Sequence, residues 1–457
     1  MEDGAYSAAG DAVRHLLHAH SPAKIRHLPL SNDVMRALVI GGGLLGLTTA
    51  YFLRQHGLEV TVVDREAGPA RATSFANGGM LHASLAHPWN EPGVFWHALK
   101  MLGREDAALL VRMKALPSLL GWGLRFVRHS QPARYLRNFE KNVHLARYSL
   151  ALMQPLRAAI GTDYDYAGRG TLKIFRAAAP FAAAQTMSQQ LATWGIPFEA
   201  LSGAAVAALE PALAPIESAI TGGLYFPADE SGDAHRFCEL LTTRCRADGV
   251  RFEFGLSVER LLRSGDRIEG ILSSQGLMTA DAYVLAAGSY STPLAHAVGV
   301  MVPVRPVKGY SLTLDTGEWP GRPNRPVIDD ALHAAVCPLG GRLRVAGTAE
   351  FAGFDLTLTP SRLNNLFDLV TQLYPNIAPY LDRHSATRWC GLRPMSADGV
   401  GIMGSTPLTN LYLNTGHGPL GWTMAAGAGK LVADDIAGKP TELNLAPYQL
   451  ARFRERY

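Results

Sequence analysis

Three glycines stand at the spacing that allows a backbone to approach a phosphate group. Gly41, Gly43 and Gly46 fit the pattern G-x-G-x-x-G. In this pattern the first glycine permits a tight turn, the second lets the backbone approach a pyrophosphate, and the third lets a helix pack closely on a strand. The free N–H groups at the start of that helix can then bind the anion. The alternative is an ordinary turn between a strand and a helix. The elements on either side of the glycines distinguish a phosphate-binding turn from an ordinary one.

Those elements form a βαβ unit. Residues 37–40 are apolar and predict a short buried strand, residues 44–56 predict a helix that stops at Gly57, and residues 59–64 predict a second strand. A right-handed crossover makes the two strands parallel, which gives an α/β core. Asp64 ends the second strand, where a carboxylate can accept hydrogen bonds from both ribose hydroxyls of an adenosine. The unit therefore predicts a dinucleotide site, which NAD and FAD would fit equally.

Three further segments favour FAD. Residues 71–80 combine small polar side chains with paired glycines and could wrap a diphosphate and a ribityl chain, although an ordinary loop has a similar composition. Residues 281–288 predict a late strand with a small tip, against which an adenine can pack. Residues 411–423 predict a strand, a glycine turn and a helix start, which could face the flavin edge that gains charge on reduction.

Bulk composition excludes several other classes of protein. The 457 residues are 47% hydrophobic and 18% charged, which suits one large or two interleaved domains, and a net charge of +4 is too weak to indicate nucleic-acid binding. The four cysteines are widely spaced, which argues against a zinc site and a disulfide framework and favours a cytoplasmic location. No run of eighteen apolar residues predicts a spanning helix.

The expected domains exchange the chain more than once. Residues 1–34 read as a flexible extension whose histidines (His15, His18, His20 and His27) are expected to be unconnected rather than metal ligands. Residues 35–92, 228–300 and 389–440 are assigned to an FAD-binding domain. Residues 93–227 and 301–388 are assigned to a substrate domain with a basic helical insertion at 96–141. Residues 441–457 are expected to form a C-terminal tail.

Seven segments in order resemble one family of flavoenzymes: residues 73–80, 88–94, 170–176, 229–233, 307–312, 391–395 and 414–424. From Met35 onward the chain resembles the small subunit, or single-chain form, of the bacterial D-amino acid dehydrogenases, within the glycine oxidase and D-amino acid oxidase superfamily. The resemblance implies a Rossmann-like FAD-binding domain interleaved with an antiparallel-sheet substrate domain. It also implies oxidative deamination, in which the substrate Cα–H leaves as hydride to FAD and the imino acid hydrolyses to a 2-oxo acid and ammonia.

The resemblance also suggests roles for individual residues. Arg393 matches the arginine that relatives use as a bidentate carboxylate clamp, with a structural salt bridge as the alternative. Tyr310 could orient the substrate or be a packed aromatic, and Lys308 could neutralise reduced flavin or pair with a surface acid. His417 could be a catalytic base, although a histidine held by backbone contacts is the favoured interpretation. Cys390 lies near the position at which sarcosine oxidases tether flavin but out of register, so we expect non-covalent FAD.

The residues expected to contact the cofactor come from all these motifs. They are Gly41, Gly43, Leu44, Leu45, Gly46, Asp64, Arg65, Thr73, Ser74, Asn77, Gly78, Gly79, Met80, Val258, Ala287, Gly288, Gly391, His417, Gly418, Leu420, Gly421, Trp422 and Thr423.

The basic insertion raises the question of the electron acceptor. Residues 96–141 carry nine Lys and Arg residues interleaved with leucines, Trp122 and Phe126, and prolines are expected to break the helices at Pro117 and Pro132. A basic amphipathic surface suits the headgroup layer of an anionic membrane, where a quinone would be the acceptor. A soluble helical cap is the alternative. An oxygen-using amine oxidase, a glycine- or hydroxyproline-type enzyme and a structural flavoprotein subunit of a hetero-oligomer also stay open.

Overall fold

The computed structural model describes residues 34–94 and 109–454, so the expectations for residues 1–33 and for the first part of the basic insertion lie outside the described residues. The glycine turn joins β1 (Arg36–Ile40) to α2 (Leu44–Gln55), and β2 (Glu59–Asp64) follows. β1 pairs in parallel with β2 on one side and with β13 (Ala282–Leu285) on the other. Gly57 stops the helix with φ +85°. The predicted βαβ unit and parallel α/β core are therefore confirmed.

This parallel core belongs to a six-stranded sheet with the order β19-β20-β13-β1-β2-β9. The outer strands are β19 (Ile402–Ser405), β20 (Leu411–Thr415) and β9 (Arg251–Phe254). Alternate β1 residues face opposite sides of the sheet. Val39 packs in the core beneath α2, α8 (Ala234–Ala247), α11 (Ala425–Ile436) and α5 (Pro132–Ile160), whereas Leu38 and Ile40 pack towards β10 (Val258–Ser264) and β11 (Arg267–Ser273).

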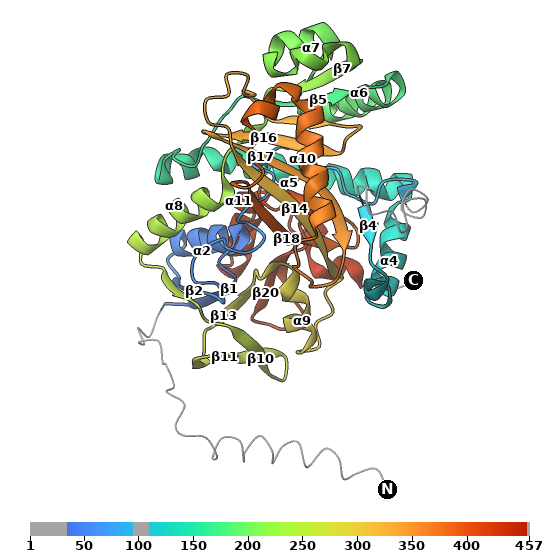
Figure 1. The fold of residues 1–457 in the computed structure, drawn as a ribbon. Coiled ribbons are helices and arrows are strands. Elements are labelled where there is room, and N and C mark those ends of the chain that lie inside the picture. Colours follow the sequence, from blue (N-terminus) through green and yellow to red (C-terminus); the bar gives the residue numbers. More distant parts are fainter. Residues whose placement is uncertain (1–33, 95–108, 455–457) are drawn as a thin grey trace.

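A nine-stranded mixed sheet forms the second half of the molecule (Figure 1). Its order is β18-β14-β17-β16-β15-β5-β7-β6, with β4 (Leu109–Val111) pairing in parallel with β17. The first three strands in this order are β18 (Thr387–Ser396), β14 (Val304–Asp315) and β17 (Arg342–Phe351). The remainder are β16 (Ala334–Leu339), β15 (Val327–Asp329), β5 (Thr171–Phe175), β7 (Gly222–Phe226) and β6 (Glu199–Ser202). α10 (Pro360–Leu373) packs against this sheet through its apolar face.

Several boundaries differ from the sequence-based expectation. Residues 109–111 form β4 where a helix was expected, because Leu110 and its neighbours pair with the edge of β17. Pro117 and Pro132 stand in the first turn of α4 (Leu116–His129) and of α5, where the missing N–H costs no hydrogen bond. The expected domain boundary at residue 389 falls inside β18, which pairs with β14 along its length. In the expected tail, Leu450 is buried and Arg452 pairs with Asp398 at 2.7 Å.

Candidate cofactor and substrate site

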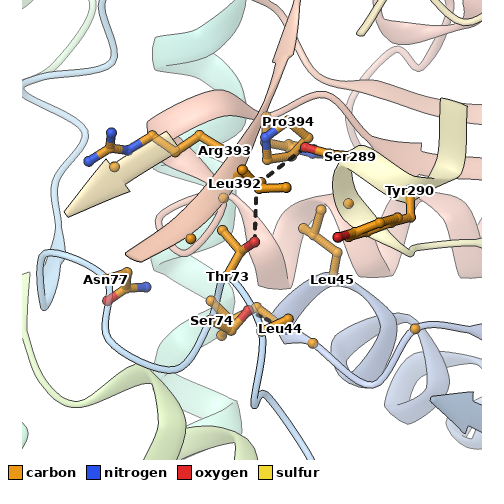
Figure 2. Close-up of a pocket in the computed structure, with 18 of the residues that line it drawn as sticks. Leu44, Leu45, Thr73, Ser74, Asn77, Ser289, Tyr290, Leu392, Arg393 and Pro394 are labelled. Atoms are coloured by element: carbon orange, nitrogen blue, oxygen red, sulfur yellow. Dashed lines mark hydrogen bonds between the residues drawn. The ribbon is translucent and has the colours of Figure 1, made fainter. Parts of the chain in front are cut away.

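A cavity of about 940 Å³ lies where the two sheets meet. The β1–α2 turn, residues 70–78 and the tip of β13 form its wall on the side of the parallel sheet. Residues of β14, β17 and β18 also line it, as do residues 417–419, 421 and 422. Figure 2 shows that Leu44, Leu45, Thr73 and Ser74 lie on one side of this space and Leu392 and Arg393 on another. Apart from β17, these segments are ones that the sequence singled out.

The glycine turn is shaped for close approach by a ligand. Gly41 has φ +118°, and a Cβ there would lie 2.5 Å from the carbonyl oxygen of Ala286. A Cβ on Gly46 would overlap the carbonyl oxygen of Gly41, so any other residue would push α2 away from the turn. The first turn of α2 has no acidic residue, and its Leu44 N–H donates to the Ser74 hydroxyl at 3.3 Å. The positive end of the helix dipole therefore faces the cavity and favours an anion.

Asp64 lies beside this turn. Its Oδ2 accepts the Gly42 N–H at 2.6 Å and its Oδ1 accepts the Glu66 N–H at 2.9 Å. Burial raises the pKa of Asp64, and the two backbone bonds oppose that rise. Each oxygen keeps a second lone pair, so the carboxylate can still accept the hydroxyls of a ribose. The neighbouring Arg65 lies over the ring of Tyr290 at 4.0 Å, and both line the cavity.

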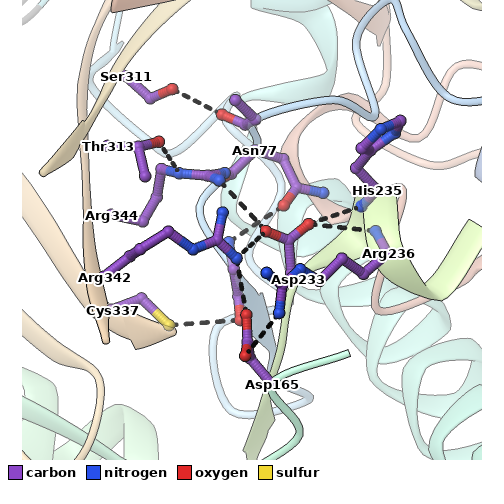
Figure 3. Close-up of polar contacts among 12 residues, drawn as sticks. Asn77, Asp165, Asp233, His235, Arg236, Ser311, Thr313, Cys337, Arg342 and Arg344 are labelled. Atoms are coloured by element: carbon purple, nitrogen blue, oxygen red, sulfur yellow. Dashed lines mark hydrogen bonds and ion pairs between the residues drawn. The ribbon is translucent and has the colours of Figure 1, made fainter. Parts of the chain in front are cut away.

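The loop at residues 71–80 is attached to the mixed sheet. Thr73 Oγ1 donates to the Leu392 carbonyl at 3.0 Å, and Ser311 Oγ donates to the Ala76 carbonyl at 2.7 Å. Arg344 donates to the Asn77 carbonyl at 2.7 Å and pairs with Asp233 at 3.6 Å (Figure 3). These contacts hold the loop between the two sheets.

Arg393 is the best-placed anion-binding group in the cavity. Its Nη1 is buried and has no hydrogen-bond partner, and no carboxylate in the described part of the chain pairs with the guanidinium. Burial without such a partner lowers the pKa of Arg393 to about 10. The side chain lies 5.8 Å from the ring of Trp89 and passes over Gly309, where a Cβ would overlap the guanidinium. Within the described chain, the structural salt bridge considered as an alternative for Arg393 is absent.

The structure places Lys308 and Tyr310 differently from Arg393. Lys308 does not line the cavity; its Nζ lies 3.0 Å from Asp355 Oδ2 and 3.6 Å from Glu350 Oε2. This is the pairing with an acid that the sequence left as one alternative. Tyr310 contributes to the cavity wall, but its hydroxyl donates to Glu350 Oε2 at 2.6 Å. Its hydroxyl is therefore already committed to a structural carboxylate.

Two histidines in the cavity wall lack partners. His417 is 3% exposed, and neither of its ring nitrogens has a hydrogen-bond partner among the described residues. The expectation that backbone contacts satisfy His417 is therefore wrong. His82 also lines the cavity, with an unpartnered Nδ1. Burial lowers the pKa of His417 to about 3 and that of His82 to about 4, so both rings are neutral near pH 7.

Most residues expected to contact the cofactor line this cavity. They are Gly41, Gly43, Leu44, Leu45, Asp64, Arg65, Thr73, Ser74, Asn77, Gly78, Met80, Val258, Ala287, Gly288, Gly391, His417, Gly418, Gly421 and Trp422.

Four expected cofactor residues do not line the cavity, and each has another structural role. Gly46 packs on the glycine turn, Gly79 donates its N–H to Asn77, Leu420 is buried in the core, and Thr423 Oγ1 accepts the His82 N–H.

The cavity is also lined by residues that were not predicted, among them Trp89, Ser289, Tyr290 and Thr348. Of these four, only Trp89 carried a signal, because it lies in a segment used for the family resemblance.

Comparison with known proteins agrees with this geometry. The family model described as "FAD dependent oxidoreductase" matches residues 36–435. A "D-amino acid dehydrogenase" of Bradyrhizobium diazoefficiens is 40% identical over 93% of this chain and all of that relative. Another, from Dechloromonas aromatica, is 43% identical over 89% of this chain and 98% of the relative.

Solved structures share the fold. The glycine oxidase of Bacillus cereus has a TM-score of 0.68 at 22% identity and covers 89% of this chain and 96% of its own. The L-proline dehydrogenase of P. horikoshii has a TM-score of 0.74 at 18% identity and covers 93% of this chain and 99% of its own. The glycine cradle, the helix terminus and Asp64 fit the phosphates and ribose of FAD. The chain therefore belongs to the family of FAD-dependent oxidoreductases that includes these D-amino acid dehydrogenases.

Proposed function

We propose that this protein oxidises D-amino acids to 2-oxo acids and ammonia with non-covalent FAD. The observation that carries the proposal is Arg393, a guanidinium that no carboxylate within residues 34–94 and 109–454 pairs with, in a cavity that also contains the cofactor-binding elements. A flavoprotein that used FAD only for structure would gain nothing from such a group. The "D-amino acid dehydrogenase" relatives, 40–43% identical over nearly their whole length, support the same substrate class.

The residues of this chain bind and orient the substrate. Arg393 holds the carboxylate with two parallel hydrogen bonds, which fixes the plane of that group. Trp89 borders the guanidinium and limits its movement. Positioning of this kind can supply up to about 7–11 kcal/mol of a reaction barrier. When bound, FAD supplies the acceptor for the hydride from Cα. The neutral rings of His417 and His82 each offer one donor and one acceptor to groups in the cavity.

Product analysis tests this proposal. Purified holoenzyme is incubated with D-alanine and an artificial electron acceptor, and pyruvate and ammonia are quantified. We expect equal amounts of the two products from D-alanine and none from L-alanine. Formation of 2-oxo acid from L-alanine alone would contradict the proposal.

We further infer that a quinone is the acceptor, reached through peripheral contact of α4 with an anionic membrane. Leu120 and Leu124 lie one turn apart on α4 and are 70% and 76% exposed, beside the exposed Arg125 and Arg128. Trp122 anchors the opposite face of the helix to the Met395 carbonyl at 3.1 Å, on the strand that carries Arg393. An exposed apolar stripe with flanking arginines suits a lipid headgroup layer. No helix within residues 34–94 and 109–454 is long and apolar enough to cross a membrane.

Vesicle binding and peroxide formation test the acceptor. We expect co-sedimentation with anionic but not with neutral phosphatidylcholine vesicles, and loss of binding in Leu120→Ser/Leu124→Ser. Ser118→Ala, in the same helix, is the matched control. Peroxide formed in proportion to D-alanine consumed would identify an oxygen-using oxidase instead. Equal binding to both vesicle types would remove the electrostatic part of the inference.

A further inference from the structure

Thr348 occupies a bulge between β14 and β17. Gly309 pairs with Ala349 and Tyr310 pairs with Gly347, so Thr348 stands opposite no residue. Its φ is +54°, a region that β-branched residues rarely adopt. Backbone strain of this kind persists only where the surroundings enforce it, and it is concentrated at ligand sites. Bulges likewise re-aim a side chain next to an active site.

The Thr348 hydroxyl has no hydrogen-bond partner among the residues that the structure describes. The residue lines the cavity, and its Oγ1 is buried without a hydrogen bond to any described residue. A buried hydroxyl that makes no hydrogen bond carries the full cost of its lost hydration. Together with the strained backbone, this unpartnered hydroxyl indicates that a ligand supplies its partner.

The position of Arg393 indicates which part of the ligand that partner is. β14 lies between β18, which carries Arg393, and β17, which carries Thr348. Arg393 reaches across β14 over Gly309, which lacks a side chain, and Gly309 pairs with the residue next to Thr348. Neighbouring strands are only about 4.8 Å apart. Arg393 Nη1 and Thr348 Oγ1 therefore border the same part of the cavity, and both are buried polar atoms without a partner in the described part of the chain.

We propose that the Thr348 hydroxyl donates a hydrogen bond to the substrate carboxylate that Arg393 binds. This inference rests on the proposed function, because it takes the ligand to be an amino acid. Arg393 fixes the plane of the carboxylate, and a second donor from β17 fixes its position within that plane. Thr348 is thus a substrate-binding residue that helps to set the direction of Cα.

Three substitutions separate the hydroxyl from the backbone. Thr348→Ser keeps the hydroxyl, Thr348→Val keeps the branched shape, and Thr348→Gly relieves the positive φ. We expect kcat/KM for D-alanine to stay within about threefold in the serine variant and to fall about 10- to 100-fold in the other two, as for a lost hydrogen bond to a charged group. If Thr348 served only the bulge, glycine would be the best substitute, and wild-type kinetics in Thr348→Gly would overturn the inference.

Binding of pyruvate gives a readout that needs no turnover. Its dissociation constant is measured from the change in flavin absorbance of the holoenzyme, in the wild type, the Thr348 variants and Arg393→Leu. We expect weaker binding in Thr348→Gly and in Arg393→Leu, and near wild-type binding in Thr348→Ser. If pyruvate binds in this pattern but D-alanine is not oxidised, the proposed function fails and Thr348 stands as a carboxylate ligand. If D-alanine is oxidised and pyruvate binding is unchanged in Thr348→Gly, the function stands and this inference fails.

Discussion

Replacing Arg393 by leucine should remove substrate recognition while leaving the unliganded protein at least as stable as the wild type. The guanidinium is buried at Nη1, and no described carboxylate pairs with it. An unpaired buried charge costs free energy in the folded state. The apolar leucine side chain removes that cost, so the melting temperature of the holoenzyme should be unchanged or higher.

The expected loss of activity follows from the type of contact. Truncating one partner of a buried, hydrogen-bonded charge pair costs about 2–5 kcal/mol, and every 1.4 kcal/mol corresponds to about tenfold. About 3 kcal/mol, within this range, corresponds to about 100-fold, so we expect kcat/KM for D-alanine to fall about 100-fold or more in Arg393→Leu. Arg393→Lys keeps the charge but loses the planar guanidinium with its two parallel donors. We expect kcat/KM for D-alanine to fall about tenfold or more in this variant.

The assay compares steady-state kinetics at matched flavin content. The ratio of flavin to protein should equal that of the wild type, because Arg393 approaches the cavity from the mixed sheet rather than from the glycine turn. Arg388→Leu serves as a control on the same strand, since Arg388 is exposed and does not line the cavity. A change in kcat/KM below about threefold would refute the assignment of Arg393 as the carboxylate clamp. A large drop in melting temperature would show instead that Arg393 is structural.

Three further outcomes are expected. Gly309→Ala should displace the flexible Arg393 head, which a Cβ would overlap, and lower kcat/KM at least about tenfold with little change in melting temperature. Wild-type kinetics in Gly309→Ala would show that the Arg393 guanidinium does not lie over Gly309. Gly41→Ala should purify with reduced flavin content, because φ +118° and the nearby Ala286 carbonyl leave no room for a Cβ; full occupancy would contradict this. Asp229 is 2% exposed, and burial raises its pKa to about 7. Since its unfolded pKa is near 3.9, the folded state binds the extra proton, and stability falls as pH rises from about 4 to 7. The melting temperature of Asp229→Asn relative to that of the wild type should therefore rise between pH 5 and pH 8. A difference in melting temperature that does not change with pH would contradict this expectation.

Local features of the sequence were sufficient to predict the FAD-binding half of the fold. The apolar run before Gly41, the spacing of the three glycines and Asp64 at the next strand end are all set within about thirty residues. Elements of this kind depend on short-range geometry, which a single sequence displays directly. Most of the residues predicted from them line the cavity, whereas others, such as Gly46 and Gly79, pack outside it.

The substrate half depends on long-range pairing that the sequence does not display. β4 pairs with β17 although some 240 residues separate them, and three apolar residues could equally have continued a helix. The partners of Lys308 come from residues 350–357, so its ion pair was visible only in the folded chain. The bulge at Thr348 arises from the register between β14 and β17, and the types of residues 346–349 do not predict it.

The most direct test of the central claim is the reaction of the bound flavin with the two enantiomers of alanine in the absence of oxygen. The holoenzyme is mixed anaerobically with D-alanine or with L-alanine, and the flavin absorbance near 450 nm is followed. We expect D-alanine to bleach the flavin and L-alanine to leave it oxidised, and we expect Arg393→Leu to be bleached at least about 100-fold more slowly at limiting D-alanine. A flavin that stays oxidised with D-alanine, or that both enantiomers reduce equally, would contradict this claim.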